Sequence, residues 1–131
     1  MKFLLHFVIA LVVFFAIDLV WLGLIAKNLY SKYLGFIMSD KVNWIAALIF
    51  YALFIVGLLV FVIEPALQNP DYVQLALRAA LFGLVTYATY DLTNLATLKD
   101  WPIQITIVDL IWGTTLSTLV SVISVFIIGK L

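Results

Sequence analysis

Long runs of apolar residues, separated by short polar segments, organise the chain from end to end. Four runs stand out, at residues 3–26, 43–63, 75–98 and 103–128. A helix needs about 20 mainly apolar residues to cross the hydrocarbon core of a bilayer. The pattern therefore predicts an all-α fold: a polytopic membrane protein built as a bundle of four transmembrane helices. We expect residues 1–131 to form this single transmembrane domain, with no soluble domain beside it.

Three connections separate the predicted spans. Residues 27–42 mix lysines with aromatic side chains, so we expect a partly helical loop at the membrane surface, with Tyr30 at the level of the headgroups. Residues 64–71 contain two prolines, which end the second span. Residues 99–102 form a tight turn, and Pro102 suits the first turn of the next helix. Spans three and four are therefore predicted to be an antiparallel hairpin, and four spans place both termini on one side.

The first apolar run follows Lys2 and so resembles the start of a secretory signal. It is too long for one, and no small-residue cleavage site follows it, so we interpret residues 3–26 as a retained helix. The seven basic residues divide three to four between the two predicted sides. This division favours a cytoplasmic position for the first and third connections, but it is even enough to suit insertion in both directions.

The composition agrees with a lipid environment and excludes several functions. Hydrophobic residues make up 66% of the chain and charged residues 11%, whereas soluble domains are about half apolar and one quarter charged. Seven basic residues balance seven acidic ones, so no basic surface is available for nucleic acid. The absence of cysteine excludes thiolate catalysis, disulfides and covalent haem attachment. We expect the lipid bilayer as a partner, no nucleic-acid partner and no cofactor; a homo-oligomer stays open.

Three carboxylates lie inside predicted spans: Asp18, Asp91 and Asp109. An ionised side chain at the centre of a transmembrane helix costs at least about 2.5–3.5 kcal/mol, so three of them need an explanation. The alternating direction of the spans places all three about 9–12 Å below the same membrane face. They gain most by facing inward, where protein groups replace water as partners. The sequence therefore predicts that the three converge on one acidic pocket inside the bundle.

Aromatic and polar residues accompany these carboxylates at helical spacing. Tyr87 and Asn94 share one helix face with Asp91. Trp21 and Trp112 each follow a carboxylate by three residues, and a carboxylate beside an aromatic face suits an amine or quaternary ammonium group. The predicted ligand-binding residues are Asp18, Trp21, Tyr87, Asp91, Asn94, Asp109 and Trp112. The sequence identifies neither a catalytic residue nor a set of metal ligands.

Structural roles compete with this interpretation. An intramembrane Asp can also be a packing residue, capped by neighbouring hydroxyl groups or by a lysine that reaches in from a loop. We expect Trp44 and Trp101 to belong to the aromatic belt at the membrane surface, and His6 to be a polar residue at a helix end. Gly83 and Gly113 are predicted to lie at close helix contacts. The serines of the last span are typical of the same packing role: Ser117, Ser121 and Ser124.

Two blocks of sequence are distinctive: residues 16–23, which contain Asp18, and residues 86–102, which contain Asp91. In these blocks and over essentially its whole length, the chain resembles a family of small bacterial four-helix integral membrane proteins described only as a domain of unknown function. The resemblance implies four spans and a location in the bacterial inner membrane. It implies no activity, substrate or catalytic residue.

Three classes of function fit these observations. The first, which we favour, is a protein that binds or transports a small cationic or amphiphilic ligand, with the carboxylates exchanging protons for the ligand. The second is a membrane enzyme acting on a lipid, with the aspartates as ligands of a divalent cation or as general acid and base, although no metal motif supports it. The third is an accessory subunit whose polar helix faces dock another membrane protein. The sequence does not decide whether the protein is an enzyme.

Overall fold

The computed structural model describes residues 2–131, and within this range the chain is helical, without a β-strand. The elements are α1 (Lys2–Val20), η1 (Trp21–Ile25), α2 (Lys27–Leu34), α3 (Trp44–Leu58), η2 (Leu59–Ile63), α4 (Glu64–Gln68), α5 (Tyr72–Thr97) and α6 (Ile103–Gly129). The two π-helical turns continue their neighbours, so that α1 runs into η1, and α3 runs through η2 into α4. The chain therefore builds four long helical segments and the short α2.

Three of these segments are long and apolar enough to cross a membrane: Lys2–Ile25, Trp44–Gln68 and Ile103–Gly129. The prediction of a helical membrane protein is thus confirmed. The remaining long segment, α5, has 26 residues, which make about 39 Å of helix. Its polar and charged side chains make it less apolar than the other three. The fourth predicted span therefore differs from them in composition and not in length.

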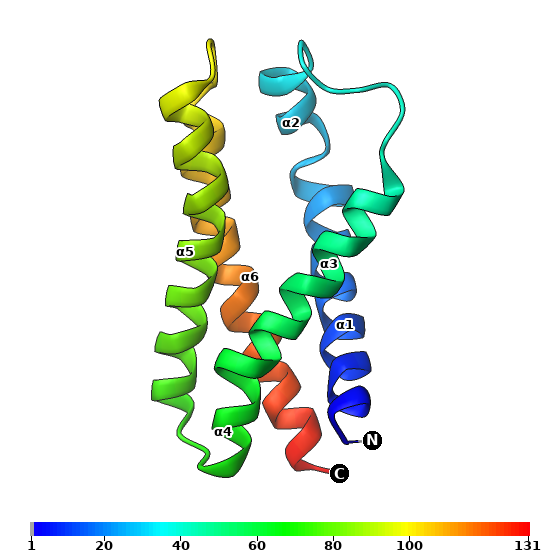
Figure 1. Ribbon diagram of the computed structural model, residues 1–131, viewed down its shortest axis with the longest axis vertical. Coiled ribbons are helices and arrows are strands. Elements are labelled where there is room, and N and C mark those ends of the chain that lie inside the picture. Colours follow the sequence, from blue (N-terminus) through cyan, green and yellow to red (C-terminus); the bar gives the residue numbers. More distant parts are fainter. Residues whose placement is uncertain (1) are drawn as a thin grey trace.

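Figure 1 shows how the segments are arranged. Both termini and the turn from α4 to α5 lie at one end of the molecule, and α2 lies at the other end with the turn between α5 and α6. The two helices α5 and α6 run in opposite directions and share the most extensive helix contact, as the tight turn between them predicts. The first half of α3 leans away from α5. The bundle is consequently closed near the termini and splayed toward α2.

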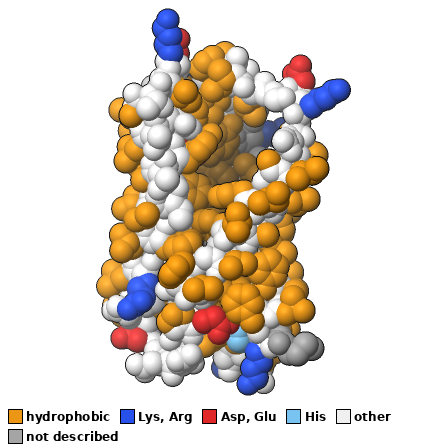
Figure 2. All heavy atoms as spheres, in the orientation of Figure 1, with side chains coloured by type: hydrophobic (Ala, Val, Ile, Leu, Met, Phe, Trp, Pro, Cys, Tyr) orange, Lys and Arg blue, Asp and Glu red, His pale blue; other side chains and the backbone are white. Residues whose placement is uncertain are grey.

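The core fills the closed end of the bundle. Ile55, Leu58 and Ile63 from α3 and η2 pack in one cluster with Leu116 and Val120 of α6, and all five are fully buried. Large apolar side chains also cover the outer surface (Figure 2). Every long segment has apolar side chains that are at least 60% exposed, among them Leu4, Leu24, Ile45, Phe61, Leu81 and Ile111. So much exposed apolar surface requires lipid to cover it.

The closest helix contact joins α5 and α6 through their glycines. A Cβ atom on Gly83 would collide with the backbone carbonyl of Gly113 and would lie 2.6 Å from the Oγ of Ser117. A Cβ atom on Gly113 would collide with the ring of Tyr87. The predicted close contacts at both glycines are therefore confirmed, and they hold the two backbones together just below the three carboxylates.

Two π-helical turns, which the sequence did not predict, interrupt the α-helical hydrogen bonding of the first two segments. In η1 the N–H of Ala26 donates to the carbonyl of Trp21 at 2.7 Å, five residues earlier. In η2 the N–H of Glu64 donates to the carbonyl of Leu59, immediately before Pro65. A π-turn accommodates one more residue than an α-turn, and such turns often occur at functional sites. The turn η1 carries Trp21, one of the predicted site residues.

Candidate functional site

A cavity of about 430 Å³ lies where the bundle splays apart, near the end that carries α2. It is visible as a hollow in the upper part of the face shown in Figure 2. Its walls come from α1, η1, α2, α3, α5 and α6. Five of the seven predicted ligand-binding residues line it: Asp18, Trp21, Tyr87, Asp109 and Trp112.

Two carboxylates from different helices line this cavity. Asp18 of α1 accepts a hydrogen bond from the Nε1 of Trp112 at 3.4 Å. Asp109 of α6 accepts a hydrogen bond from the hydroxyl of Tyr30 at 2.5 Å. Both side chains are 8% exposed, so each keeps a small accessible surface inside the cavity.

Two tryptophans form one wall of the cavity beside Asp18. The rings of Trp21 and Trp112 are stacked, with their centroids 4.4 Å apart and an angle of 10° between their planes. The sequence suggested that each Trp serves the carboxylate three residues before it. The structure differs, because the indole N–H of Trp112 reaches the carboxylate of α1 instead of Asp109 on its own helix. The tryptophans thus join α1 to α6 and present a single aromatic surface.

The other two predicted residues, Asp91 and Asn94, do not line the cavity. Asp91 is fully buried at the contact between α5 and α6, and no donor within residues 2–131 reaches either of its carboxyl oxygens. The backbone carbonyl of Asp91 accepts a hydrogen bond from Thr106 of α6 at 3.4 Å, so its carboxyl group is buried close to that of Asp109, one turn further along α6. Asn94 is half-buried, one turn further along α5 and beside Tyr90. The expectation that all three carboxylates line one pocket is therefore wrong for one of them. Asp18 and Asp109 line the cavity, whereas Asp91 is buried between α5 and α6.

Sequence reasoning missed several residues of the wall. Tyr30 was expected among the headgroups, but the break at Ala26 turns α2 back over the cavity, where the hydroxyl of Tyr30 meets Asp109. Burial, and then the bond to this carboxylate, raise the pKa of Tyr30 above its usual value, so the hydroxyl remains a donor. From α3, Phe50 and Tyr51 also line the cavity. In the sequence these two residues stand within a continuous apolar run, where nothing distinguishes them from core residues.

The cavity is acidic and aromatic. Its lining includes two carboxylates, two tryptophans and four tyrosines, and no Lys, Arg or His side chain from residues 2–131. Over the same residues, no group of three or more His, Cys, Asp or Glu side chains is arranged to hold a metal ion. The hypothesis of a metal-dependent lipid enzyme therefore gains no support from the geometry.

The structure also gives the surroundings of the residues for which the sequence predicts structural roles: two tryptophans, a histidine and three serines. Trp44 is 65% exposed, whereas Trp101 is only 7% exposed and its Nε1 donates to Thr106 at 3.0 Å. Trp101 is therefore a packing residue of the turn between α5 and α6 and not part of an aromatic belt. His6 does more than end a helix, because its Nδ1 lies 2.6 Å from Glu64 and joins α1 to α4. The three serines of α6 are fully buried in packing contacts: Ser117, Ser121 and Ser124.

Apolar helices that expose their hydrophobic side chains outward and bury carboxylates inward define a small helical integral membrane protein. Residues 3–126 match the sequence model of the family described as "Predicted membrane protein (DUF2177)", and the chain belongs to that family. Its function is not known, so no site residue is carried over from it. No match was found among curated proteins or among solved structures.

Proposed function

We propose that the protein crosses the bacterial inner membrane four times, with α5 as the fourth span and both termini on one side. The exposed residues of α5 are largely apolar, including Leu77 at 63% and Leu81 at 61%. Its most costly side chain, Asp91, is turned inward and fully buried. A helix of this length, paired along its course with the apolar α6, suits a membrane even though its own composition is mixed.

Single cysteines test this topology cleanly, because the chain contains no cysteine of its own. Lys2→Cys and Lys130→Cys should be labelled by a membrane-impermeant maleimide from the same side of sealed vesicles. Lys99→Cys, in the turn between α5 and α6, should be labelled from the opposite side. If Lys99→Cys reacts from the same side as the two terminal positions, α5 does not cross the membrane.

We further propose that the cavity binds a small cationic amphiphile, such as an amine or a quaternary ammonium compound with an apolar group. The observation that carries this proposal is the pairing of two carboxylates with stacked tryptophans in one cavity that has no basic side chain. A cation is attracted both by the carboxylates and by the faces of aromatic rings. The exposed apolar parts of the wall, among them Phe50, would hold the hydrophobic part of the ligand.

The buried pair of Asp91 and Asp109 suits coupling of this binding to a proton. Two neighbouring carboxyl groups that are buried between helices repel each other when both are ionised, so such a pair favours holding one proton. A cation bound against Asp109 favours the ionised form of that group, so binding would release the shared proton. This exchange is the basis for extending the proposal from binding to proton-coupled transport.

Isothermal titration calorimetry of the full chain in detergent micelles tests the cation site. The probe is benzyltrimethylammonium, compared with an uncharged carbon isostere of the same shape. We expect binding of the cation only, and Asp18→Asn should weaken it by about tenfold or more, a loss of about 1.4 kcal/mol.

The matched control is Asp40→Asn, which removes an exposed carboxylate from the loop at the same end of the molecule. It should bind as the wild type does. Equal binding of the cation and the isostere, or an equal loss in both variants, would show that the cavity is not a cation site.

A further inference from the structure

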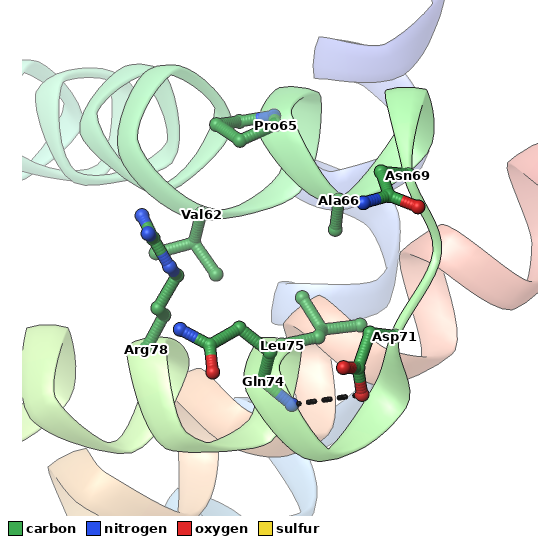
Figure 3. A pocket seen from close by; sticks show the side chains of 8 residues that line it. All are labelled: Val62, Pro65, Ala66, Asn69, Asp71, Gln74, Leu75 and Arg78. Atoms are coloured by element: carbon green, nitrogen blue, oxygen red, sulfur yellow. Dashed lines mark hydrogen bonds between the residues drawn. The ribbon is translucent and has the colours of Figure 1, made fainter.

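A second, smaller cavity of about 180 Å³ lies at the other end of the molecule, where the chain turns from α4 into α5. Its floor is apolar and includes Val62 and Leu75, which are both nearly buried. Figure 3 shows Arg78 and Gln74 projecting from α5 beneath η2 and α4, with Asn69 on the turn at the far side. We call this cavity the turn groove. It combines an apolar base with a polar, cationic rim.

Arg78 has no acidic partner in the part of the chain that the structure describes. The single ion pair within residues 2–131 joins His6 to Glu64. The carboxylate on the rim of the turn groove, Asp71, is engaged in capping α5, since its Oδ1 accepts hydrogen bonds from the N–H groups of Val73 at 3.1 Å and Gln74 at 3.3 Å. A guanidinium group stays charged at every physiological pH. Arg78 is exposed at the rim of the groove, so its guanidinium group is free to bind an anion from outside the chain.

The location of the turn groove indicates where that anion comes from. The apolar span Trp44–Gln68 ends at the groove, so the groove lies where hydrocarbon gives way to headgroups. Arg78 is six residues after the start of α5, about 9 Å along the helix, and its long side chain can reach back to this level. Gln74 lies one turn before it on the same face, so both side chains point into the groove.

We propose that the turn groove binds the phosphate group of a membrane phospholipid. The planar guanidinium group of Arg78 matches two phosphate oxygens at once. The amide groups of Gln74 and Asn69 on the rim are donors for the remaining oxygens, and the apolar floor accommodates the glycerol carbons. This site is separate from the cavity of the proposed cation, at the opposite end of the bundle, and does not depend on it.

Native mass spectrometry of the full chain tests this proposal. The protein is equilibrated with phosphatidylglycerol, or with a glycosyl diacylglycerol of the same acyl chains that lacks phosphate, and the retained lipid is counted. We expect the wild type to retain the phospholipid in preference to the glycolipid. Arg78→Gln should retain about fivefold less phospholipid, the effect of one basic side chain at a membrane surface, while Arg78→Lys should lie between the two.

The matched control is Lys130→Gln, which removes a positive charge from the same end of the molecule but outside the groove. It should behave as the wild type. Equal losses in Arg78→Gln and Lys130→Gln, or equal retention of both lipids, would overturn the proposal. Displacement of the phospholipid by millimolar inorganic phosphate would retain the phosphate site but refute a lipid as its source. Circular dichroism confirms that each variant is folded.

Discussion

Replacing Gly83 by Ala tests the closest helix contact of the molecule with the smallest side chain available. The added methyl group would collide with the backbone carbonyl of Gly113 and lie 2.6 Å from the Oγ of Ser117. The serine can rotate away, but the carbonyl belongs to the backbone of α6. The methyl group can therefore be accommodated only if α5 and α6 move apart. Because these helices share the most extensive contact in the bundle, many packed side chains would lose contact together.

The magnitude follows from two opposing terms. Overpacking of a close contact costs about 1–3 kcal/mol, and a backbone obstacle favours the upper part of this range. Ala stabilises a helix by about 0.5–1 kcal/mol relative to Gly, so the net loss for Gly83→Ala is about 1–2 kcal/mol. Gly57 is an intermediate case, because its added methyl group would meet a side-chain ring atom of Phe82 at 3.1 Å, which can give way more easily than a backbone carbonyl. Gly129 has no atom within 4 Å of such a group, so Gly129→Ala should lose nothing.

The assay is reversible unfolding of the three variants in detergent, with helix content measured by circular dichroism. The expected order of stability is Gly129→Ala, then Gly57→Ala, then Gly83→Ala. Gly129→Ala should equal or exceed the wild type. If Gly83→Ala is as stable as Gly129→Ala, the helices are not in contact at this point, and the packing argument for α5 and α6 fails.

Three further predictions concern the cavity. Tyr30→Phe removes the donor to Asp109, so amide hydrogen exchange in α2 should become about 5- to 10-fold faster, as expected for the loss of about 1–1.4 kcal/mol. Unchanged exchange would mean that this hydrogen bond does not hold α2 in place. Trp21→Leu removes an aromatic face but keeps an apolar side chain, so the Kd for benzyltrimethylammonium should rise about 2- to 30-fold, the effect of losing a cation–π contact of about 0.5–2 kcal/mol. An unchanged Kd in calorimetry would exclude the ring of Trp21 from the site. Asp91→Asn should keep the fold, because it replaces a buried carboxyl group by an uncharged group of the same shape, but it should abolish proton release on ligand binding. Release that persists in buffers of different ionisation enthalpy would place the exchanged proton elsewhere.

The parts of the structure that follow from local sequence were predictable. Long apolar runs define the helices because a lipid environment leaves few alternatives, and Pro102 and its neighbours define the turn before α6. The energetic cost of an intramembrane carboxylate predicts that Asp18, Asp91 and Asp109 are buried, and all three are. Glycine inside a membrane helix likewise predicts that Gly83 and Gly113 lie at close helix contacts, and the structure shows that they lie at the same contact. Each of these inferences depends on one residue type and its cost in one environment.

The shape of the cavity was not predictable, because it depends on how the helices diverge. Tyr51 enters the wall since α3 leans away from α5, and no local pattern encodes that angle. Trp112 could have served Asp109 on its own helix or Asp18 on another, and the spacing is the same in both cases. Trp101 looked like a surface aromatic because it stands in a turn, and its partners Tyr90 and Thr106 on the two flanking helices explain its burial. Such pairings depend on how neighbouring helices pack and not on the spacing of residues along one helix.

The π-turn η1 makes the length of the chain before α2 a determinant of the site. A π-turn is equivalent to an α-helix with one residue inserted, so deleting one residue between Trp21 and Ile25 would restore an unbroken α-helix. Everything beyond the deletion would then rotate by about 100° and draw back by about 1.5 Å. Tyr30 would no longer point at Asp109, and α2 would leave the mouth of the cavity. In η1, a change in the number of residues would therefore alter the site more than a change in residue type.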